Sequence, residues 1–296
     1  MRGADRSVSI WQLTNSAWNQ ETIISSRHSP QQPFRLAASS YLNSAPVIWS
    51  FLHGSRRSTV QLIDAVPARC AQLLSDGAVE GALVPVIEYQ RIPGISLVRD
   101  VCVGSRKEVR SVLLVSRTND LKEVRSVALD ETSRTSAALV KIVFREFLSR
   151  EPRWTTVSPN LKAMLEDSDA ALIIGDPAMT FPREPFKIWD MASLWREHTG
   201  LGFIFAMWMV SDSAIEEAKR IDFAGAREEG LSRVEEIVSS YENVIPLSEE
   251  ELRTYLTENI AFTPDHSMER GLRLYYELAF KHQLIENVKP LRFIES

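Results

Sequence analysis

The sequence predicts an α/β protein with two lobes and a ligand site in the cleft between them. From residue 34 onward, strand patterns alternate with helix patterns, the order typical of strand-helix-strand units in parallel sheets. The chain of 296 residues is also about twice the usual length of one domain. Ligands of open α/β sheets bind beyond the carboxyl ends of the strands. The site is therefore expected where the two lobes face each other.

The first strand-helix unit begins with the apolar segment 34–40, which predicts a short strand. A helix follows it. Asn43 or Ser44 can cap the start of this helix and Pro46 suits its first turn. Gly54 ends it, because glycine adopts the left-handed conformation common after a helix.

The next segments complete a three-strand unit, after which the chain leaves it. We predict a strand over 58–66, a helix over 67–77 and a buried strand over 81–89. Residues 101–116 hold two apolar stretches around a charged middle that contains glycine. That pattern suits either a hairpin or a strand that crosses between the lobes.

A second unit follows the crossing. Segment 126–149 repeats the order of strand, polar turn and helix, and 169–179 is a buried strand that runs into a Gly-Asp-Pro turn. Segment 187–210 returns to a strand rich in aromatic residues. After Ser211 only helical signals remain, and they include a capping box and a Thr-Pro helix start: Ser248 with Glu251, and Thr263 with Pro264.

This order predicts that one lobe is built from both ends of the chain. Lobe 1 is expected to hold residues 34–112 and 203–296, and lobe 2 residues 113–202. Residues 1–33 are rich in Ser, Gln, Asn and Pro and show no periodic apolar face. We predict that they form a polar extension, disordered or loosely attached.

Composition excludes several classes of protein. With 34 Lys plus Arg against 39 Asp plus Glu, the net charge of −5 argues against nucleic acid as a partner. The longest apolar run, 203–210, is less than half of a membrane span, so no membrane partner is expected. Cys70 and Cys102 lack metal or disulfide spacing, which favours a reducing, cytoplasmic location without a metal site. The oligomeric state is left open.

Three strand-to-helix turns are dense in small polar donors: 39–46, 129–136 and 174–178. The first two begin helices, and the exposed N–H groups of a helix N-terminus attract anions. If both face one cleft, an organic anion with a carboxylate at either end is the expected ligand. The alternative is that the small polar residues are ordinary helix caps: Asn43, Ser44, Ser133 and Ser136.

Few other residues offer chemistry. The carboxylates with suitable placement for acid or base catalysis lie at the ends of predicted strands: Glu88, Asp130 and Asp176. Each of them can equally brace a loop by accepting backbone N–H bonds. Cys102 is interpreted as a small core residue rather than a nucleophile. Core or hinge packing is also the interpretation of three tryptophans: Trp189, Trp195 and Trp208.

A set of motifs resembles the chorismate dehydratase family of the futalosine route to menaquinone. They run in order from residue 35 to residue 208: SSYLNSAP, DAVPARCAQLLSDGAVEGALVPVIEY, RSVLLVS, VALDETSRTSAALVKIVFRE, DAALIIGDPA and TGLGFIFAMW. The resemblance implies a two-lobed fold like that of type II periplasmic binding proteins. It also implies a carbon-oxygen lyase that removes water from chorismate to give 3-[(1-carboxyvinyl)oxy]benzoate without a cofactor.

The resemblance also implies which residues form the site. Asn43 and Ser111 would be the catalytic residues: the amide bonds the leaving hydroxyl or the ether oxygen, and the serine donates to a carboxylate. The remaining residues would bind the substrate, shape its pocket or form the opposing wall: Tyr41, Ser44, Ser133, Thr135, Ser136, Gly175 and Asp176. No histidine offers a base, so we hypothesise that the enolpyruvyl carboxylate of the substrate removes the ring proton itself.

Two other functions fit the same fold. One is 1,4-dihydroxy-6-naphthoate synthase of the same pathway, which is disfavoured because the YLN turn at 41–43 belongs to the dehydratase branch. The other is a non-catalytic protein that binds small organic anions. That function needs an exported chain, and the first 33 residues have no secretory signal pattern.

Overall fold

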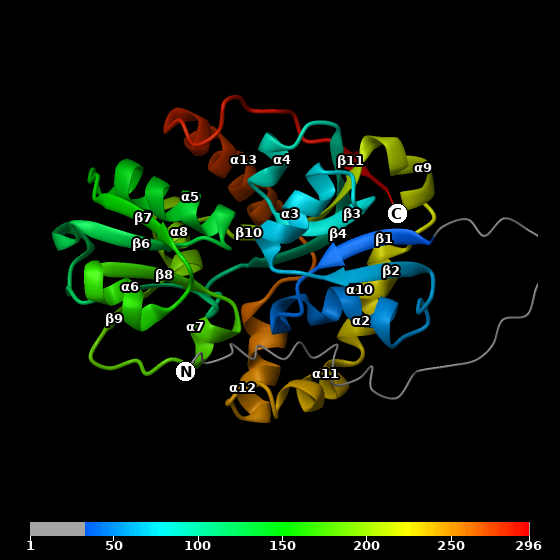
Figure 1. The fold of residues 1–296 in the computed structure, drawn as a ribbon, viewed down its shortest axis with the longest axis horizontal. Helices are drawn as coiled ribbons and strands as arrows, with labels where there is room; N and C mark the ends of the chain where they lie inside the picture. Colours follow the sequence, from blue (N-terminus) through cyan, green and yellow to red (C-terminus); the bar gives the residue numbers. More distant parts are fainter. Residues whose placement is uncertain (1–32, 296) are drawn as a thin grey trace, which may run out of the picture.

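The strands of the protein divide between two mixed sheets, one of six strands and one of five (Figure 1). The structure, a computed structural model, describes residues 33–295, so the predicted extension up to residue 32 lies outside the described part. The six-stranded sheet has the order β11-β4-β10-β3-β1-β2: Phe34–Ala38 (β1), Val60–Asp64 (β2), Gly81–Pro85 (β3), Ile95–Ser105 (β4), Phe203–Ser211 (β10) and Phe293–Ile294 (β11). The five-stranded sheet has the order β7-β6-β8-β5-β9: Val112–Ser116 (β5), Ser126–Asp130 (β6), Arg153–Val157 (β7), Ala170–Ile174 (β8) and Lys187–Asp190 (β9).

Helices cover both faces of each sheet (Figure 1). The six-stranded sheet lies between one group of helices, Pro67–Ser75 (α3), Glu88–Arg91 (α4) and His266–Lys281 (α13), and a second group, Ala45–Leu52 (α2) and Phe223–Leu231 (α10). The five-stranded sheet lies between Arg134–Ile142 (α5) with Met191–Thr199 (α8) and Leu161–Asp167 (α6) with Asp176–Thr180 (α7). The other helices are Ile215–Ala218 (α9), Val234–Tyr241 (α11) and Glu249–Thr254 (α12). In Figure 1, α11 and α12 lie below α2 and below the junction of the two sheets.

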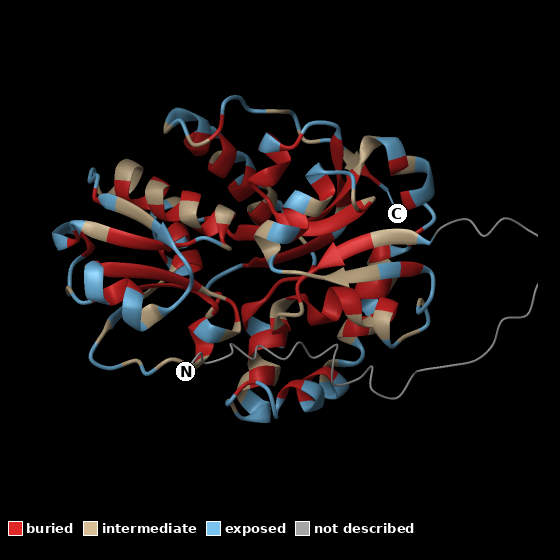
Figure 2. Cartoon of the chain, in the orientation of Figure 1, coloured by how far each residue is buried: buried red, intermediate tan, exposed pale blue. Residues whose placement is uncertain are grey.

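This layering explains why the central strands are apolar along their whole length. Every residue of β3 and β5 is buried, since helices pack on both faces of their sheets. Figure 2 shows the buried residues concentrated in the strands and on the inward sides of the helices. Trp195 and Trp208 are fully buried and Trp189 partly so, which confirms the predicted core packing. Cys102 is also a core residue, and burial raises the pKa of its thiol.

The structure decides between the two readings of residues 101–116. The first apolar stretch belongs to β4 of the six-stranded sheet and the second to β5 of the five-stranded sheet, so the chain crosses between sheets and the hairpin alternative is wrong. It crosses back between β9 and β10, with α8 between them, where the sequence predicted a single aromatic strand. We call the part around the six-stranded sheet lobe 1 and the part around the five-stranded sheet lobe 2. Their boundaries at 112/113 and 202/203 stay a prediction.

Some local expectations differ from the structure. The predicted strand over 81–89 ends at Pro85, and its last two residues lie in α4 instead. After Ser211 the chain is not only helical, because β11 pairs with β4, and β7 was not predicted. The capping box of α12 is confirmed. By contrast α13 begins two residues after the Thr-Pro pair, with Asp265 as its cap.

Candidate functional site

A small enclosed cavity of about 70 Å³ lies between the two lobes. The carboxyl ends of β1, β3, β6 and β8 lead into the turns around it, as expected for an α/β protein. Lobe 1 and lobe 2 both line it, and seven of the predicted site residues are among the lining: Tyr41, Asn43, Ser44, Ser133, Thr135, Ser136 and Gly175. The other two, Ser111 and Asp176, stand next in the chain to lining residues Val112 and Gly175. We call this space the inter-lobe cavity.

The turn after β1 presents side chains to this cavity. Residues Leu42–Ser44 form one 3₁₀ turn before α2 begins. The Ser44 hydroxyl donates to Asn43 Oδ1 at 3.3 Å and lies 3.2 Å from the Ser39 hydroxyl. Because the Asn43 oxygen already accepts a bond, its amide N–H groups are the part left to donate. Ser44 makes no side-chain cap bond to α2, so it is not the ordinary cap that the alternative reading required.

The start of α2 offers fewer free N–H groups than expected. The 3₁₀ turn uses two of them: Ser44 N–H donates to Tyr41 O at 2.9 Å and Ala45 N–H donates to Leu42 O. Pro46 has no N–H, and the N–H of Leu42 donates to Asp176 Oδ1 of lobe 2 at 3.2 Å. An anion at this turn would therefore meet chiefly the Asn43 amide and the serine hydroxyls.

The N-terminus of α5 retains the properties expected of an anion site. Its first helical bond runs from Ala137 N–H to Ser133 O at 3.1 Å, so the three preceding N–H groups have no acceptor within the helix. Ser133 stands at the cap position without a side-chain cap bond, which again differs from an ordinary cap. Thr135 Oγ1 accepts from Ile87 N–H of lobe 1 at 3.2 Å, and its hydrogen remains available. The positive end of α5 thus faces the inter-lobe cavity.

Ser111 is held between the two lobes. It is fully buried, directly before β5, and its carbonyl accepts from Gly175 N–H at 2.8 Å. The hydroxyl of Tyr255, also fully buried, donates to Ser111 Oγ at 2.6 Å. Sequence reasoning missed Tyr255, since it lies in the C-terminal region where the pattern showed only helices.

Gly175 and Tyr41 face each other across the cavity. Gly175 has φ of +69° and ψ of −156°, a region that residues with side chains rarely adopt. A Cβ on it would lie 3.0 Å from the ring of Tyr41. The group that approaches this glycine closely is thus an aromatic ring of lobe 1. Burial, with the nearby carboxylates of Asp130 and Asp176, raises the pKa of Tyr41 to about 12.

Two of the three candidate carboxylates are already engaged. Glu88 is buried and pairs with Arg91 at 3.0 Å and with Arg134 at 2.9 Å. Asp130 accepts from both the N–H and the hydroxyl of Thr132, at 2.8 and 2.6 Å, so it braces its own turn. Neither lines the inter-lobe cavity among the described residues.

Asp176 has the electrostatic properties of a site residue. Burial raises the pKa of its carboxyl to about 7, and the single bond from Leu42 N–H opposes that rise. Near neutral pH the group is therefore poised between its two protonation states. A bound anion nearby would raise the pKa further and keep the carboxyl neutral.

The lobes are closed around the cavity. Four bonds between the lobes lie here: Leu42 N–H to Asp176, Ile87 N–H to Thr135, the Tyr275 hydroxyl to Thr135 O, and Arg134 to Glu88. Sites for small molecules usually measure about 300 to 1,000 Å³, whereas this cavity measures about 70 Å³. A ligand with two carboxylates must part the lobes to enter.

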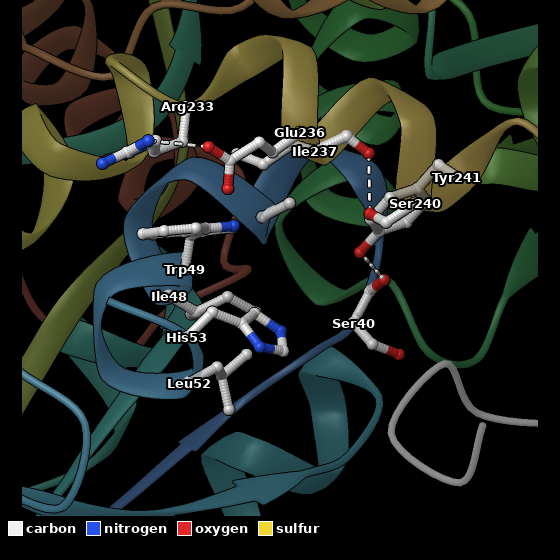
Figure 3. A pocket seen from close by; sticks show the side chains of 11 residues that line it. Ser40, Ile48, Trp49, Leu52, His53, Arg233, Glu236, Ile237, Ser240 and Tyr241 are labelled. Carbon is white, nitrogen blue, oxygen red and sulfur yellow. Dashed lines mark hydrogen bonds and ion pairs between the residues drawn. The ribbon is translucent and has the colours of Figure 1, made fainter. Parts of the chain in front are cut away.

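A larger cavity of about 440 Å³ lies between α2 and α11 (Figure 3). We call it the α2/α11 cavity. Trp49 forms one wall, with the Arg233 guanidinium 5.7 Å from its ring centre, and Arg233 pairs with Glu236 at 2.7 Å. The Tyr241 hydroxyl donates to Ser40 O at 2.7 Å at its far end. This cavity has the greater volume, but none of the predicted site residues lines it.

Within residues 33–295, no group of three or more His, Cys, Asp or Glu side chains could hold a metal ion. No helix in that range has the length and apolar character needed to cross a membrane.

The comparisons with known proteins point to one family and one fold. A profile of the family described as menaquinone biosynthesis matches residues 34–281. A chorismate dehydratase of Thermus thermophilus is 29% identical over 232 residues, which cover 71% of this chain and 82% of that protein. A chorismate dehydratase of Campylobacter jejuni is 26% identical over 151 residues, or 51% of this chain and 53% of that protein.

Solved structures share the fold at low identity. A protein of Archaeoglobus fulgidus has a TM-score of 0.69 at 15% identity, covering 87% of this chain and 100% of that chain. The periplasmic aliphatic sulphonate binding protein of Escherichia coli has a TM-score of 0.57 at 14% identity, covering 88% and 93%. The predicted two-lobed fold, like that of periplasmic binding proteins, is confirmed.

Proposed function

The chain belongs to the menaquinone biosynthesis family, and from this premise we propose that it is a chorismate dehydratase. The reaction removes water from chorismate and gives 3-[(1-carboxyvinyl)oxy]benzoate. The two relatives named chorismate dehydratase support this reaction. One observation carries the proposal: hydroxyls, an amide and the N-terminus of α5 converge on one enclosed cavity between the lobes.

The cavity suits a dianion held by neutral donors. None of the described residues that line it is a lysine or an arginine. Chorismate carries one carboxylate on its ring and one on its enolpyruvyl arm. In the proposed complex, the N-terminus of α5 with Ser133, Thr135 and Ser136 binds one carboxylate, and Ser111 donates to the other. Tyr41 shapes the pocket around the ring.

The chemistry needs few groups, because the ring becomes aromatic as water leaves. The proton departs from the ring carbon that bears the ether, the neighbouring carbon loses its hydroxyl, and the electron pair of the C–H bond enters the ring. Asn43 donates to the leaving hydroxyl or to the ether oxygen. We propose that the enolpyruvyl carboxylate of the substrate accepts the proton, so that the protein mainly orients the substrate.

The contacts of the three candidate carboxylates show how far each is available to act as a base supplied by the protein. Glu88 is bound to two arginines and Asp130 to its own turn, whereas Asp176 has a pKa of about 7. We expect replacement of each by the amide to leave kcat within about tenfold of the wild type. A loss of kcat by about four orders in one variant, with binding intact, would instead identify that residue as the base.

The decisive experiment is to incubate the purified protein with chorismate and follow the benzoate product by liquid chromatography. Turnover is the expected result. Tight binding of chorismate without turnover would indicate an anion-binding protein. The absence of both binding and turnover would overturn the proposed reaction and direct attention to another step of menaquinone biosynthesis.

A further inference from the structure

We infer that Tyr255 is a positioning residue for the proposed dehydratase reaction. Its hydroxyl sets the direction in which the Ser111 hydroxyl and the Asn43 amide donate. The inference rests on the proposed function. Tyr255 does not itself line the inter-lobe cavity, and it acts on the substrate only through residues that stand there. The starting point is a hydrogen bond between two fully buried hydroxyls.

The first step is the direction of that bond. The Tyr255 hydroxyl donates to Ser111 Oγ at 2.6 Å. A hydroxyl has one hydrogen to donate, so Ser111, which accepts here, keeps its own hydrogen for another partner. Its neighbour Val112 lines the inter-lobe cavity, where a ligand oxygen would be that partner. Tyr255 therefore makes Ser111 a donor toward the cavity.

The second step concerns Asn43. Its amide also interacts with the Tyr255 hydroxyl, and together with the bond to Ser111 this interaction partly opposes the rise that burial causes in the pKa of Tyr255. Because the single hydrogen of the Tyr255 hydroxyl goes to Ser111, the amide N–H of Asn43 is the donor toward the Tyr255 oxygen. The Asn43 oxygen accepts from Ser44 at 3.3 Å. A chain of hydrogen bonds thus runs from Ser44 to Asn43, from Asn43 to Tyr255 and from Tyr255 to Ser111. The second amide hydrogen of Asn43 is not used in it.

The third step is the protonation state. Burial, aided by the carboxylate of Asp176, holds the pKa of Tyr255 well above its usual value. The phenol stays protonated near neutral pH and does not serve as a base. Its contribution is to keep two donors aligned, and misalignment of donors by fractions of an ångström costs rate.

The fourth step is where Tyr255 comes from. It is the first residue of the π-helical turn Tyr255–Asn259 that follows α12. Such turns often occur at functional sites. The turn brings the C-terminal helices to the point where Asn43 of lobe 1 meets Ser111 at the start of β5. Tyr255 thereby links a donor of lobe 1 with a donor at the crossing between the lobes.

The test is Tyr255→Phe, which removes one oxygen and keeps the ring. We expect kcat for chorismate to fall by about 10- to 100-fold with KM changed by less than about threefold, as for the loss of a positioning hydrogen bond. The matched control is Tyr89→Phe, since Tyr89 is also a buried tyrosine and its hydroxyl donates at the same 2.6 Å, to Pro290 O in a different part of lobe 1. The control is expected to lower the melting temperature but not kcat.

A double substitution separates positioning from stability. If Tyr255 acts through Ser111 as well as Asn43, then Ser111→Ala with Tyr255→Phe should lose less kcat than the product of the two single losses. Losses that multiply, or a Tyr255→Phe protein with wild-type kcat and only a lower melting temperature, would overturn the inference while the wild type remains active. Absence of turnover by the wild type would overturn the proposed function, and this inference with it.

Discussion

The two cavities on either side of the N-terminal part of α2 differ in almost every respect. The α2/α11 cavity measures about 440 Å³ and is lined by apolar and polar side chains of one lobe, Trp49, Arg233 and Glu236 among them. The inter-lobe cavity measures about 70 Å³ and gathers hydroxyls, an amide and the end of a helix from both lobes. Beside the second lies a carboxyl, that of Asp176, whose pKa is about 7. The comparison teaches that convergence of donors from both lobes, rather than volume, marks the candidate site.

The substitution Asn43→Asp should give the largest loss of activity. It tests whether the reaction takes place in the inter-lobe cavity or elsewhere. It places a negative charge where a dianion is to bind and removes the amide donor. We expect kcat/KM for chorismate to fall by about 1,000-fold or more, since it combines charge repulsion with loss of a donor. Steady-state kinetics measure this.

Asn160→Asp is the matched control for this charge change. Asn160 is exposed and caps α6 by accepting from Ala163 N–H at 3.1 Å, a bond that aspartate can also accept. It should keep wild-type kinetics. Wild-type kinetics of Asn43→Asp would place the reaction outside the inter-lobe cavity.

Gly175→Ala should have the next largest effect. The new Cβ would lie 3.0 Å from the Tyr41 ring, on a backbone with positive φ. The ring must move, so we expect kcat/KM to fall by about 10- to 100-fold and the melting temperature to fall as well. Gly77→Ala is the control, because Gly77 has φ of +68° but no atom within 4 Å of the added carbon. Equal kinetics in the two variants would contradict the proposed contact with Tyr41.

The raised pKa of Asp176 should make the free energy of unfolding depend on pH. The pKa of this carboxyl is about 7 in the folded protein against an ordinary value of 3.8. Between those values the unfolded carboxyl has lost its proton and the folded one still holds it, so rising pH lowers the free energy of unfolding. Asp176→Asn keeps an acceptor for Leu42 N–H but cannot ionise. In urea titrations from pH 4 to pH 8, its stability relative to the wild type should rise up to about pH 7 and then level off. A constant difference at all pH values would refute the raised pKa.

The smallest effect is expected in the α2/α11 cavity. Trp49→Phe removes part of the wall and the stacking with Arg233. We expect a loss of about 1 kcal/mol in the free energy of unfolding and kcat/KM within about twofold of the wild type. Urea denaturation and the chorismate assay measure the two quantities. A tenfold loss of kcat/KM at unchanged stability would show that this cavity takes part in the reaction.

Much of the candidate site was predictable because its members lie in short local patterns. Asn43, Ser133 and Gly175 each follow a strand, and the carboxyl ends of strands in an α/β protein lead to the ligand. The same logic misplaced the free donors of α2, since a 3₁₀ turn consumed N–H groups that a regular helix start would expose. Local patterns also could not show which of Glu88, Asp130 and Asp176 is available for chemistry, because burial and hydrogen-bond partners in the folded protein decide it.

The sequence by itself determined most of the strands and helices and the polar turns, because each depends on neighbours within a few residues, but it missed β7 and β11 and left a hairpin open at residues 101–116. Tertiary structure alone decided which distant groups meet. Tyr255 reaches Ser111 across 144 residues, and Leu42 reaches Asp176 across 134. Such contacts form only when two sheets and the C-terminal helices pack together, and burial in that packing sets both the direction of the hydroxyl bonds and the pKa of Asp176.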